Sequence, residues 1–420
     1  MKSLTTIILA AGRGVRMRSA VPKVLHPVAG RPIIHYVLDV ARRAGSLKTY
    51  VVLGHQQGLV RKQLPKDATI AVQKKLLGTA DAVRTVAARL SSGSGDVLIL
   101  CGDTPLLQVQ TIKKLLRSHR VTGACATVLT AIVADPRGYG RIVRDPEGSV
   151  LAIREDKDAT AQEKEIPEIN TGVYCFRGGD LLRGLKGIRL NEFKKEFYLT
   201  DIIENLEKEG KKISAVVAED PLEGLGINSR VELSVAERLM RERILKQFML
   251  DGVGIVDPAT TYIAADAKIG RDTVIKPFTV IEENVRIGNH CQIGPFAHLR
   301  PGTRLADGVE IGNFTEVSRS SIGPDVRMKH FSFMGDAVVG AASNIGAGVV
   351  TANYDGRDKN QTLIGKQAFI GSDSILVAPV KIGAKAMTGA GSVVPAGKNI
   401  PAGKIAVGVP ARVLSRRKNS

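Results

Sequence analysis

An aliphatic residue recurs at every sixth position through much of the second half of this 420-residue chain. The unbroken series is Ile263, Ile269, Ile275, Ile281, Ile287, Ile293, Leu299, Leu305, Ile311 and Val317. A period of six fits neither the 3.6-residue repeat of an α-helix nor the alternation of an ordinary strand. It is typical of a parallel β-helix, in which each hexapeptide supplies a short strand and a corner, and the aliphatic side chains stack inward.

Small residues follow most of these aliphatic residues at a fixed distance of four positions, where they would fill the remaining interior space. They are Thr273, Thr279, Val285, Cys291, Ala297, Thr303, Val309, Thr315 and Ser321. The same phase resumes at Ile322, Met328, Met334, Ile370, Leu376 and Ile382. Residues 351–362 break the repeat and are expected to loop out. Taken alone, the repeat could serve only as a rigid spacer or as an oligomerisation platform.

The first half of the chain has a different pattern, in which apolar runs alternate with helical segments. Runs at 5–10, 49–54 and 96–101 are continuously hydrophobic, whereas 33–45 and 79–90 show helical periodicity. Such alternation predicts a Rossmann-like α/β domain whose parallel sheet is covered on both faces. In sheets of this kind, ligands bind beyond the carboxyl ends of the strands.

A charged amphipathic segment without glycine or proline, residues 229–250, separates the two patterns and predicts one connecting helix. The sequence therefore predicts an α/β domain over 1–228, a linker helix over 229–251, and a parallel β-helix over 252–420 that ends in a basic tail. A chain of this length is expected to form more than one domain.

The formal net charge of +19 favours anionic partners. Lysine and arginine are dispersed and lack interleaved aromatic residues, which argues against a nucleic-acid partner and for phosphorylated small molecules. No apolar run approaches the roughly 18 residues of a membrane span. The N-terminus lacks the pattern of a secretory signal, so we expect a cytoplasmic location. The four cysteines have no CxxC spacing and predict buried thiols rather than bridges or a zinc site.

A glycine-rich turn follows the first predicted strand. Gly12 and Gly14 would expose backbone N–H groups to phosphate oxygens, and Arg13, Arg16 and Lys23 would add charged contacts. A plain βα turn with solvated arginines is the alternative interpretation. At the end of the run 96–101 stand Gly102 and Asp103, and an aspartate there is suited to hold Mg²⁺ beside a polyphosphate. A helix-capping role for Asp103 is the alternative.

The pattern Gly-x-Gly, arginine and then Pro22-Lys23 resembles the nucleotidyltransferases that join a sugar 1-phosphate to a nucleoside triphosphate. Further segments extend the resemblance: 73–79, 138–142, 154–159, 168–172 and 226–228. Together they resemble the uridylyltransferase half of the bacterial bifunctional GlmU family. The resemblance implies that Arg16 and Lys23 act in catalysis and that Asp103 and Asn228 bind Mg²⁺.

The nucleotide-sugar site implied by this resemblance comprises Ala11, Gly12, Arg13, Gly14, Lys23, Gln73, Gly78, Thr79, Gly102, Asp103, Gly140, Glu155, Asn170 and Asn228. In the family, the positions of Gln73, Gly78 and Thr79 hold the uracil, and those of Gly140, Glu155 and Asn170 hold the sugar. Two departures bear on selectivity: Val15 replaces the usual threonine, and Asp81 stands where many members have histidine.

The second half resembles the acetyltransferase half of the same family, a left-handed β-helix that works as a homotrimer with active sites between subunits. His330 is implied as the general base that takes a proton from the sugar amine, a task for which imidazole is well suited. The site for acetyl-CoA and the amino-sugar phosphate is implied to comprise Arg300, His330, Asn344, Ala347, Asn353, Tyr354, Ser372 and Ala390. Three features depart from the family pattern: Ser318 replaces the usual lysine, Phe333 replaces the usual tyrosine and lacks its hydroxyl, and the basic residue expected near the C-terminus is not evident.

The resemblance thus implies a bifunctional enzyme that acetylates glucosamine 1-phosphate with acetyl-CoA and then transfers a uridylyl group from UTP. The product would be UDP-N-acetylglucosamine for cell-envelope polymers such as peptidoglycan and lipopolysaccharide. Two alternatives stay open on the sequence. The chain could be a nucleotidyltransferase whose β-helix serves assembly or acetylates another amine, or it could be a non-catalytic scaffold. The retained Arg16, Lys23, Asp103 and Asn228 argue against a scaffold.

Overall fold

The computed structural model describes residues 3–90, 95–191 and 195–414, and the chain divides into two compact units. One unit comprises Met1–Val28 and Pro32–Arg238, and the other comprises Ala29–Arg31 and Leu239–Ser420. The division falls inside the long helix α8, Arg230–Leu250. Most of the basic tail noted in the sequence, residues 415–420, lies outside the described residues. Among the described residues, no helix has both the length and the apolar character needed to cross a membrane.

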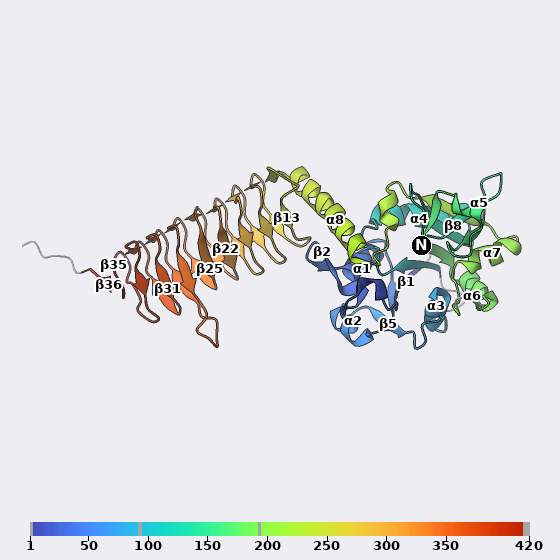
Figure 1. Ribbon diagram of the computed structural model, residues 1–420, viewed down its shortest axis with the longest axis horizontal. Coiled ribbons are helices and arrows are strands. Elements are labelled where there is room, and N and C mark those ends of the chain that lie inside the picture. The colour runs from blue at the N-terminus through green and yellow to red at the C-terminus, as the bar shows by residue number, and fades with distance from the viewer. Residues whose placement is uncertain (1–2, 91–94, 192–194, 415–420) are drawn as a thin grey trace, which may run out of the picture. The chain divides into compact units, whose positions relative to one another are not determined.

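A sheet forms the centre of the first unit (Figure 1). It has nine strands, and its main path runs in the order β11-β7-β10-β6-β1-β4-β5. Its strands are β1 Leu4–Ala10, β4 Lys48–Leu53, β5 Thr69–Val72, β6 Asp96–Cys101, β7 Ala126–Ile132, β8 Arg141–Arg144, β9 Val150–Arg154, β10 Glu168–Arg177 and β11 Ile213–Val217. A small separate sheet pairs β2 Pro27–Val28 with β3 Arg31–Pro32.

The helices of the first unit are α1 Ile33–Arg43, α2 Gln57–Gln63, α3 Thr79–Ala87, α4 Val109–Thr122, α5 Ala161–Lys164, α6 Gly178–Gly187 and α7 Asp201–Lys208. Three short 3₁₀ segments are η1 Val15–Met17, η2 Lys23–Leu25 and η3 Pro221–Gly224. Each predicted strand and helix of this half is present within a few residues of its expected bounds.

Both faces of the central sheet are buried, as the continuous hydrophobicity of its strands predicts. Ile7 of β1 packs in a core with residues of α3, α6 and α7, whereas its neighbour Ile8 packs in a second core with residues of α1 and α4. Both isoleucines are fully buried. The sheet differs from the prediction in one respect, because β10 runs antiparallel to β6 and β7 and makes the sheet mixed.

The second unit is a parallel β-helix with three sheets, whose coils are stacked in chain order (Figure 1). The first sheet contains β12 Gly254–Ile255, β15 Val274–Ile275, β18 Gln292–Ile293, β21 Glu310–Ile311, β24 Arg327–Met328, β27 Asn344–Ile345, β30 Phe369–Ile370, β33 Met387–Thr388, β35 Ile405–Val407 and β36 Arg412–Val413. The second contains β13 Tyr262–Ile263, β16 Val280–Ile281, β19 His298–Leu299, β22 Thr315–Ser318, β25 Ser332–Gly335, β28 Val350–Ala352, β31 Ile375–Val377 and β34 Val393–Val394. The third contains β14 Lys268–Ile269, β17 Arg286–Ile287, β20 Arg304–Leu305, β23 Ser321–Ile322, β26 Ala337–Val339, β29 Thr362–Ile364 and β32 Val380–Ile382.

The hexapeptide residues form the interior of these coils. Ile275, Ile293 and Ile311 lie in register on successive strands of one sheet and are almost fully buried. The predicted loop is shorter than expected. Thr351 and Thr362 are fully buried strand residues, so only residues 353–361 leave the coil.

Candidate active sites

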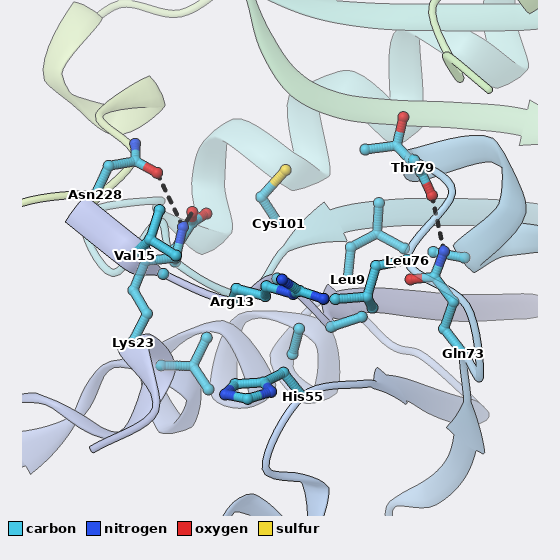
Figure 2. Close-up of a pocket in the computed structure, with 18 of the residues that line it drawn as sticks. Leu9, Arg13, Val15, Lys23, His55, Gln73, Leu76, Thr79, Cys101 and Asn228 are labelled. Carbon is cyan, nitrogen blue, oxygen red and sulfur yellow. Dashed lines mark hydrogen bonds and ion pairs between the residues drawn. The ribbon is translucent and has the colours of Figure 1, made fainter. Parts of the chain in front are cut away.

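A cavity of about 800 Å³ lies at the carboxyl ends of the parallel strands β1, β4, β5 and β6. The loop after each strand contributes to its wall, as expected for a ligand site in a sheet of this kind. Most of the predicted nucleotide-sugar residues line it: Ala11, Gly12, Arg13, Gly14, Arg16, Lys23, Gln73, Gly78, Thr79, Asp103, Glu155 and Asn228. Figure 2 shows how several of these side chains converge on one space.

The glycine-rich turn brings backbone and cationic groups together at the end of β1. Gly14 adopts φ +61°, and a Cβ atom there would lie 2.9 Å from the Cβ of Lys23, so both backbone conformation and close contact require glycine. Among the described residues, no heavy atom beyond Gly12 and its two chain neighbours lies within 4 Å of the Cβ position at Gly12. Arg13 and Arg16 are exposed and form no ion pair with a residue that the structure describes. Their guanidinium groups are therefore available to an anionic ligand.

Lys23, Asp103 and Asn228 form a polar cluster in the wall of the cavity. The ammonium of Lys23 donates to a carboxylate oxygen of Asp103 and, at 3.0 Å, to Oδ1 of Asn228. The Asn228 side chain is oriented by a second bond, because its Nδ2 donates to the carbonyl oxygen of Gly226 at 3.1 Å. A carboxylate oxygen and an amide oxygen thus face one cation, which is the donor chemistry that Mg²⁺ prefers.

The start of α8 holds Asn228 in place. The backbone N–H groups of Asn228 and Ser229 donate to one carboxylate oxygen of Glu232, at 2.6 and 2.7 Å. The hydroxyl of Ser229 accepts from the backbone N–H of Glu232 at 3.3 Å. This reciprocal capping pattern joins Asn228 rigidly to the helix.

Three predicted residues do not line the cavity. Gly102 lies behind it, where its N–H donates to the Leu9 carbonyl at 2.9 Å. Gly140 and Asn170 lie next to each other, since the N–H of Asn170 donates to the Gly140 carbonyl at 2.8 Å, and the Asn170 side chain donates to the Tyr174 hydroxyl. These three residues are therefore not among those that line the cavity.

Some lining residues were not predicted, notably His55 after β4, and Glu196 and Tyr198 before α7. None belongs to a motif that the sequence analysis singled out, and only a preceding strand end could have drawn attention to His55. Cys101 also lines the cavity, and burial raises the pKa of its thiol to about 12, with a smaller contribution from Asp103. It is therefore uncharged near neutral pH.

The predicted acetyltransferase residues lie on the β-helix, and four of them form one column. Each of these four lies two positions after the interior residue that ends a strand of the first sheet. They are His330 after β24, Ala347 after β27, Ser372 after β30 and Ala390 after β33. His330 is exposed, as predicted, and its backbone carbonyl accepts from the hydroxyls of Thr315 and Ser332 at 3.0 and 3.1 Å. The backbone of His330 is thus held in place, and its exposed side chain belongs to a column whose other members have small side chains.

Two further predicted residues come from the neighbouring sheet and its loop. Asn353 is buried and donates to Asp336, whose carboxylate is also held by the guanidinium of Arg319 at 2.7 and 2.9 Å. The adjacent Tyr354 is 61% exposed, and its hydroxyl donates to the Gly356 carbonyl. Asn344 lies on β27, three residues before Ala347 of the column.

Arg300 is separated from His330 along the strands of the second sheet. It follows β19, whereas His330 precedes β25, and these strands are parallel to one another through β22. The two residues therefore lie at opposite ends of the strands. Arg300 donates to Glu316 at 2.8 Å. A single chain does not bring all the predicted acetyltransferase residues together.

Comparison with known proteins supports the predicted domain type of both halves of the chain. Residues 6–148 match the model of the MobA-like NTP transferase domain, and residues 284–319 match six repeats of the bacterial transferase hexapeptide. The bifunctional protein GlmU of Pelotomaculum thermopropionicum is 45% identical over 413 residues, with 90% of each chain covered. That of Geobacillus thermodenitrificans is 45% identical over 410 residues, covering 90% of this chain and 89% of the relative. The protein of Shouchella clausii is 42% identical, with 91% and 92% covered.

This chain belongs to the GlmU family. The predicted family, the α/β fold joined to a left-handed β-helix, and the combination of a nucleotidyltransferase with a hexapeptide acetyltransferase for UDP-N-acetylglucosamine synthesis are confirmed. Membership also implies nucleotidyl transfer and the use of acetyl-CoA.

Two positions at which this chain departs from the GlmU pattern, Ser318 and Phe333, have defined surroundings in the structure. Ser318 is 1% exposed, and its hydroxyl accepts from Arg319 at 2.8 Å. Arg319 in turn is committed to Asp336 and so does not simply replace a missing lysine. The ring of Phe333 lies against Gly335, since a Cβ atom there would be 2.8 Å from it.

Several acidic groups surround Glu155 at the edge of the first site. Burial raises the pKa of Glu155, opposed by the hydrogen bond that it accepts from Thr200 at 2.9 Å. Burial, followed by repulsion from Glu155 and Glu204, raises the pKa of Asp201 to about 6. Deprotonation of Asp201 is therefore less favourable in the folded state than in the unfolded chain.

We expect Asp201→Asn to flatten the dependence of stability on pH. Because the folded-state pKa is raised, the native state binds more protons between about pH 4 and 6, and the free energy of unfolding falls as pH rises through this window. After allowance for solvent screening, the change amounts to about 1 kcal/mol. Thermal unfolding of wild type and variant at pH 4.5 and 7.5 measures it. If the stability of the wild type and of the variant changed equally between the two pH values, the raised pKa of Asp201 would be contradicted.

Proposed function

We propose that this chain acetylates glucosamine 1-phosphate on the β-helix and uses the first cavity to couple the product to UTP, with the residues assigned below. One observation supports the assignment of nucleotidyl transfer to this cavity most strongly: the glycine-rich turn, Lys23, Asp103 and Asn228 all line it. We assign this activity to residues 1–228 and acetyl transfer to 252–420, joined by the helix over 229–251.

In nucleotidyl transfer, an oxygen of the sugar phosphate attacks the α-phosphorus of UTP in line, and the bond to the β-phosphate oxygen breaks to release pyrophosphate. The attacking phosphate is already anionic, so no general base is needed. Arg16 and Lys23 stabilise the negative charge that spreads over the phosphoryl oxygens, and the N–H groups of the turn position them. Gln73, Gly78 and Thr79 surround the base, while Glu155 with Gly140 and Asn170 binds the sugar.

Asp103 and Asn228 are the residues that would hold Mg²⁺. Two protein oxygens suffice, because Mg²⁺ commonly retains water and substrate phosphate as its other ligands. When bound, the ion would neutralise charge on the triphosphate. Lys23 would then turn from these oxygens to the phosphates, since both roles draw on the same ammonium group.

In acetyl transfer, His330 accepts a proton from the sugar ammonium, and the free amine attacks the thioester carbonyl. The C–N bond forms, the C–S bond breaks, and coenzyme A leaves as a thiolate that takes up a proton. Asn344, Tyr354 and Arg300 bind the sugar phosphate. Ala347 and Ala390 leave room for the coenzyme A arm along the column, and Asn353 and Ser372 act around the acetyl group.

We further propose a cytoplasmic homotrimer with acetyl-transfer sites between subunits. Within one chain, Arg300 lies at the opposite end of the strands from His330. A second copy would therefore supply Arg300 to the site that contains His330. Exposed aromatic rings on the corner that also bears His330 suit such an interface: Phe278, Phe296 and Phe314 stack with centroids 4.7 and 5.1 Å apart, and Phe331 is also exposed. The cytoplasm is where UTP and acetyl-CoA are made, and the four cysteines are free thiols.

Phe296→Asp is expected to shift the trimer toward monomer by at least about tenfold in concentration, because it places a charge inside the aromatic stack. Phe296 has φ +54°, a conformation that aspartate tolerates well, so the coil should persist. Sedimentation velocity over a concentration series measures the change. Leu47→Asp, an equally polar change at an exposed site of the first unit, is the control. A wild type that sediments as a monomer would contradict the proposal.

Separate assays of free thiol and pyrophosphate test the bifunctional assignment. Wild type with acetyl-CoA, glucosamine 1-phosphate, UTP and Mg²⁺ should release both, and pyrophosphate release should depend on prior acetylation. The uridylyl assignment would be overturned if the protein released thiol with glucosamine 1-phosphate but released no pyrophosphate when N-acetylglucosamine 1-phosphate was supplied with UTP.

The buried Ser318 and the missing hydroxyl at Phe333 favour a second candidate for the β-helix, namely acetylation of a different amine. Each lost charged contact to a phosphate would weaken binding by roughly 1.5–3 kcal/mol. Pyrophosphate release from supplied N-acetylglucosamine 1-phosphate, without thiol release from glucosamine 1-phosphate, would support this alternative.

A further inference from the structure

Gln73 lines the first cavity and is 5% exposed. Gln73 follows β5, and its backbone N–H donates to the Leu53 carbonyl at 2.8 Å. Figure 2 shows its amide nitrogen turned toward the loop before Thr79 and its oxygen turned toward Leu76 and the middle of the cavity.

Both protons of this amide are bonded to acceptors of the protein itself. Nε2 of Gln73 donates to the carbonyl oxygen of Gly78 at 3.0 Å and to Oδ2 of Asp81 at 2.8 Å. A carbonyl oxygen can only accept, so the group that faces Gly78 must be the NH₂ group and not the oxygen. The carboxylate of Asp81 accepts the hydrogen bond from the second N–H. The only polar atom that Gln73 leaves for a ligand is therefore its oxygen, which accepts hydrogen bonds.

The frame around this amide is rigid. Gly78 has φ +97°, and a Cβ atom there would lie 2.6 Å from the carbonyl oxygen of Phe197. The loop is tied to the same segment by three bonds: Phe197 N–H to the Leu77 carbonyl at 2.7 Å, Ala80 N–H to the Phe197 carbonyl at 3.0 Å, and Leu199 N–H to the Thr79 hydroxyl at 3.0 Å. A reversed amide would set its oxygen against two acceptors, which a buried site strongly disfavours.

We propose that Asp81 determines which pyrimidine base the first site accepts, by holding the Gln73 amide as a pure hydrogen-bond acceptor. The inference rests on the proposed nucleotidyl transfer, in which Gln73 contacts the base. Uracil carries an N–H at ring position 3 and satisfies the Gln73 oxygen. Cytosine carries a lone pair at that position, and two lone pairs would face each other. Asp81 acts through Gln73 and is a positioning residue.

Asp81 also lies in the first turn of α3, where an acidic residue is favourable simply because of the helix dipole. The two roles make different predictions. Asp81→Asn keeps an acceptor for Nε2 of Gln73 but loses the negative charge. Asp81→Ala loses both. It leaves only the Gly78 carbonyl to oppose a reversed amide, which would turn the NH₂ group toward the lone pair of cytosine.

The test compares kcat/KM for UTP and CTP, with N-acetylglucosamine 1-phosphate as the second substrate, in wild type, Asp81→Ala and Asp81→Asn. Asp67→Ala, at an exposed acidic residue before β5, controls for the loss of a charge. Asp81→Ala is expected to lower the UTP-to-CTP ratio by about tenfold. Asp81→Asn and Asp67→Ala should keep the ratio within about twofold of wild type.

An unchanged ratio in Asp81→Ala would overturn the inference, as would a ratio in Asp81→Asn as low as that in Asp81→Ala. Calorimetric titration of the full chain with UTP and with CTP should show the same order of binding selectivity without turnover. Failure of the proposed function is distinguishable, because wild type would then release no pyrophosphate with either nucleotide.

Discussion

Asp103→Asn is expected to lower uridylyl transfer by at least about 10³-fold while leaving acetyl transfer within about twofold of wild type. The variant keeps an oxygen to accept from Lys23 and preserves the shape of the cluster, but it removes the negative charge that would hold Mg²⁺. Loss of the ion removes several kcal/mol of transition-state stabilisation. Pyrophosphate release measures the first activity, and thiol release measures the second.

Asp67→Asn provides the matched control, because it removes one charge from an exposed position of the same unit. Binding of Mn²⁺ in the presence of UTP, followed by paramagnetic resonance, gives a readout independent of turnover and should weaken in Asp103→Asn. If that variant kept most of its pyrophosphate release, the metal assignment would be wrong.

His330→Ala is expected to have the opposite effect, with acetyl transfer reduced by about 10²–10⁴-fold and uridylyl transfer preserved. His330 is exposed, so the truncation removes no core contact and should leave thermal unfolding unchanged. Thiol release from acetyl-CoA with glucosamine 1-phosphate measures the loss. Pyrophosphate release from N-acetylglucosamine 1-phosphate measures the preserved activity.

His290→Ala is a close control for His330→Ala, since His290 is also an exposed corner histidine of the β-helix. A proton-transfer role requires His290→Ala to behave as wild type. Comparable thiol release in the two variants would show that His330 is an ordinary surface residue.

The fold could be predicted to a large extent because its main signals are local. A six-residue period specifies the coil directly, and buried parallel strands read as continuous apolar runs. The antiparallel course of β10 was not predictable in this way. It depends on pairings such as Tyr174 with Ile99, and no local pattern in either strand reports the direction of a partner so distant in the sequence.

The predicted loop illustrates the limit of a pattern. Thr351 and Thr362 interrupt the aliphatic series in sequence, yet both are fully buried in strands. Threonine fits the interior of a narrow coil when its hydroxyl finds a partner, as that of Thr351 does in the backbone of Gly335 at 2.8 and 3.1 Å. The residue type alone therefore misplaces the ends of the loop.

By itself, the sequence determined the kinds of chemistry available to this protein: a phosphate-binding turn with its cations, an aspartate after a strand, and an exposed histidine in a coil of fixed period. Their proximity was decided by tertiary structure. Strand register aligns His330 with Ala347, Ser372 and Ala390, and helix packing sets Asp81 behind Gln73. The physical reason is range: propensity and periodicity act over a few residues, whereas hydrogen bonds and burial at a site join segments that only the folded chain brings together.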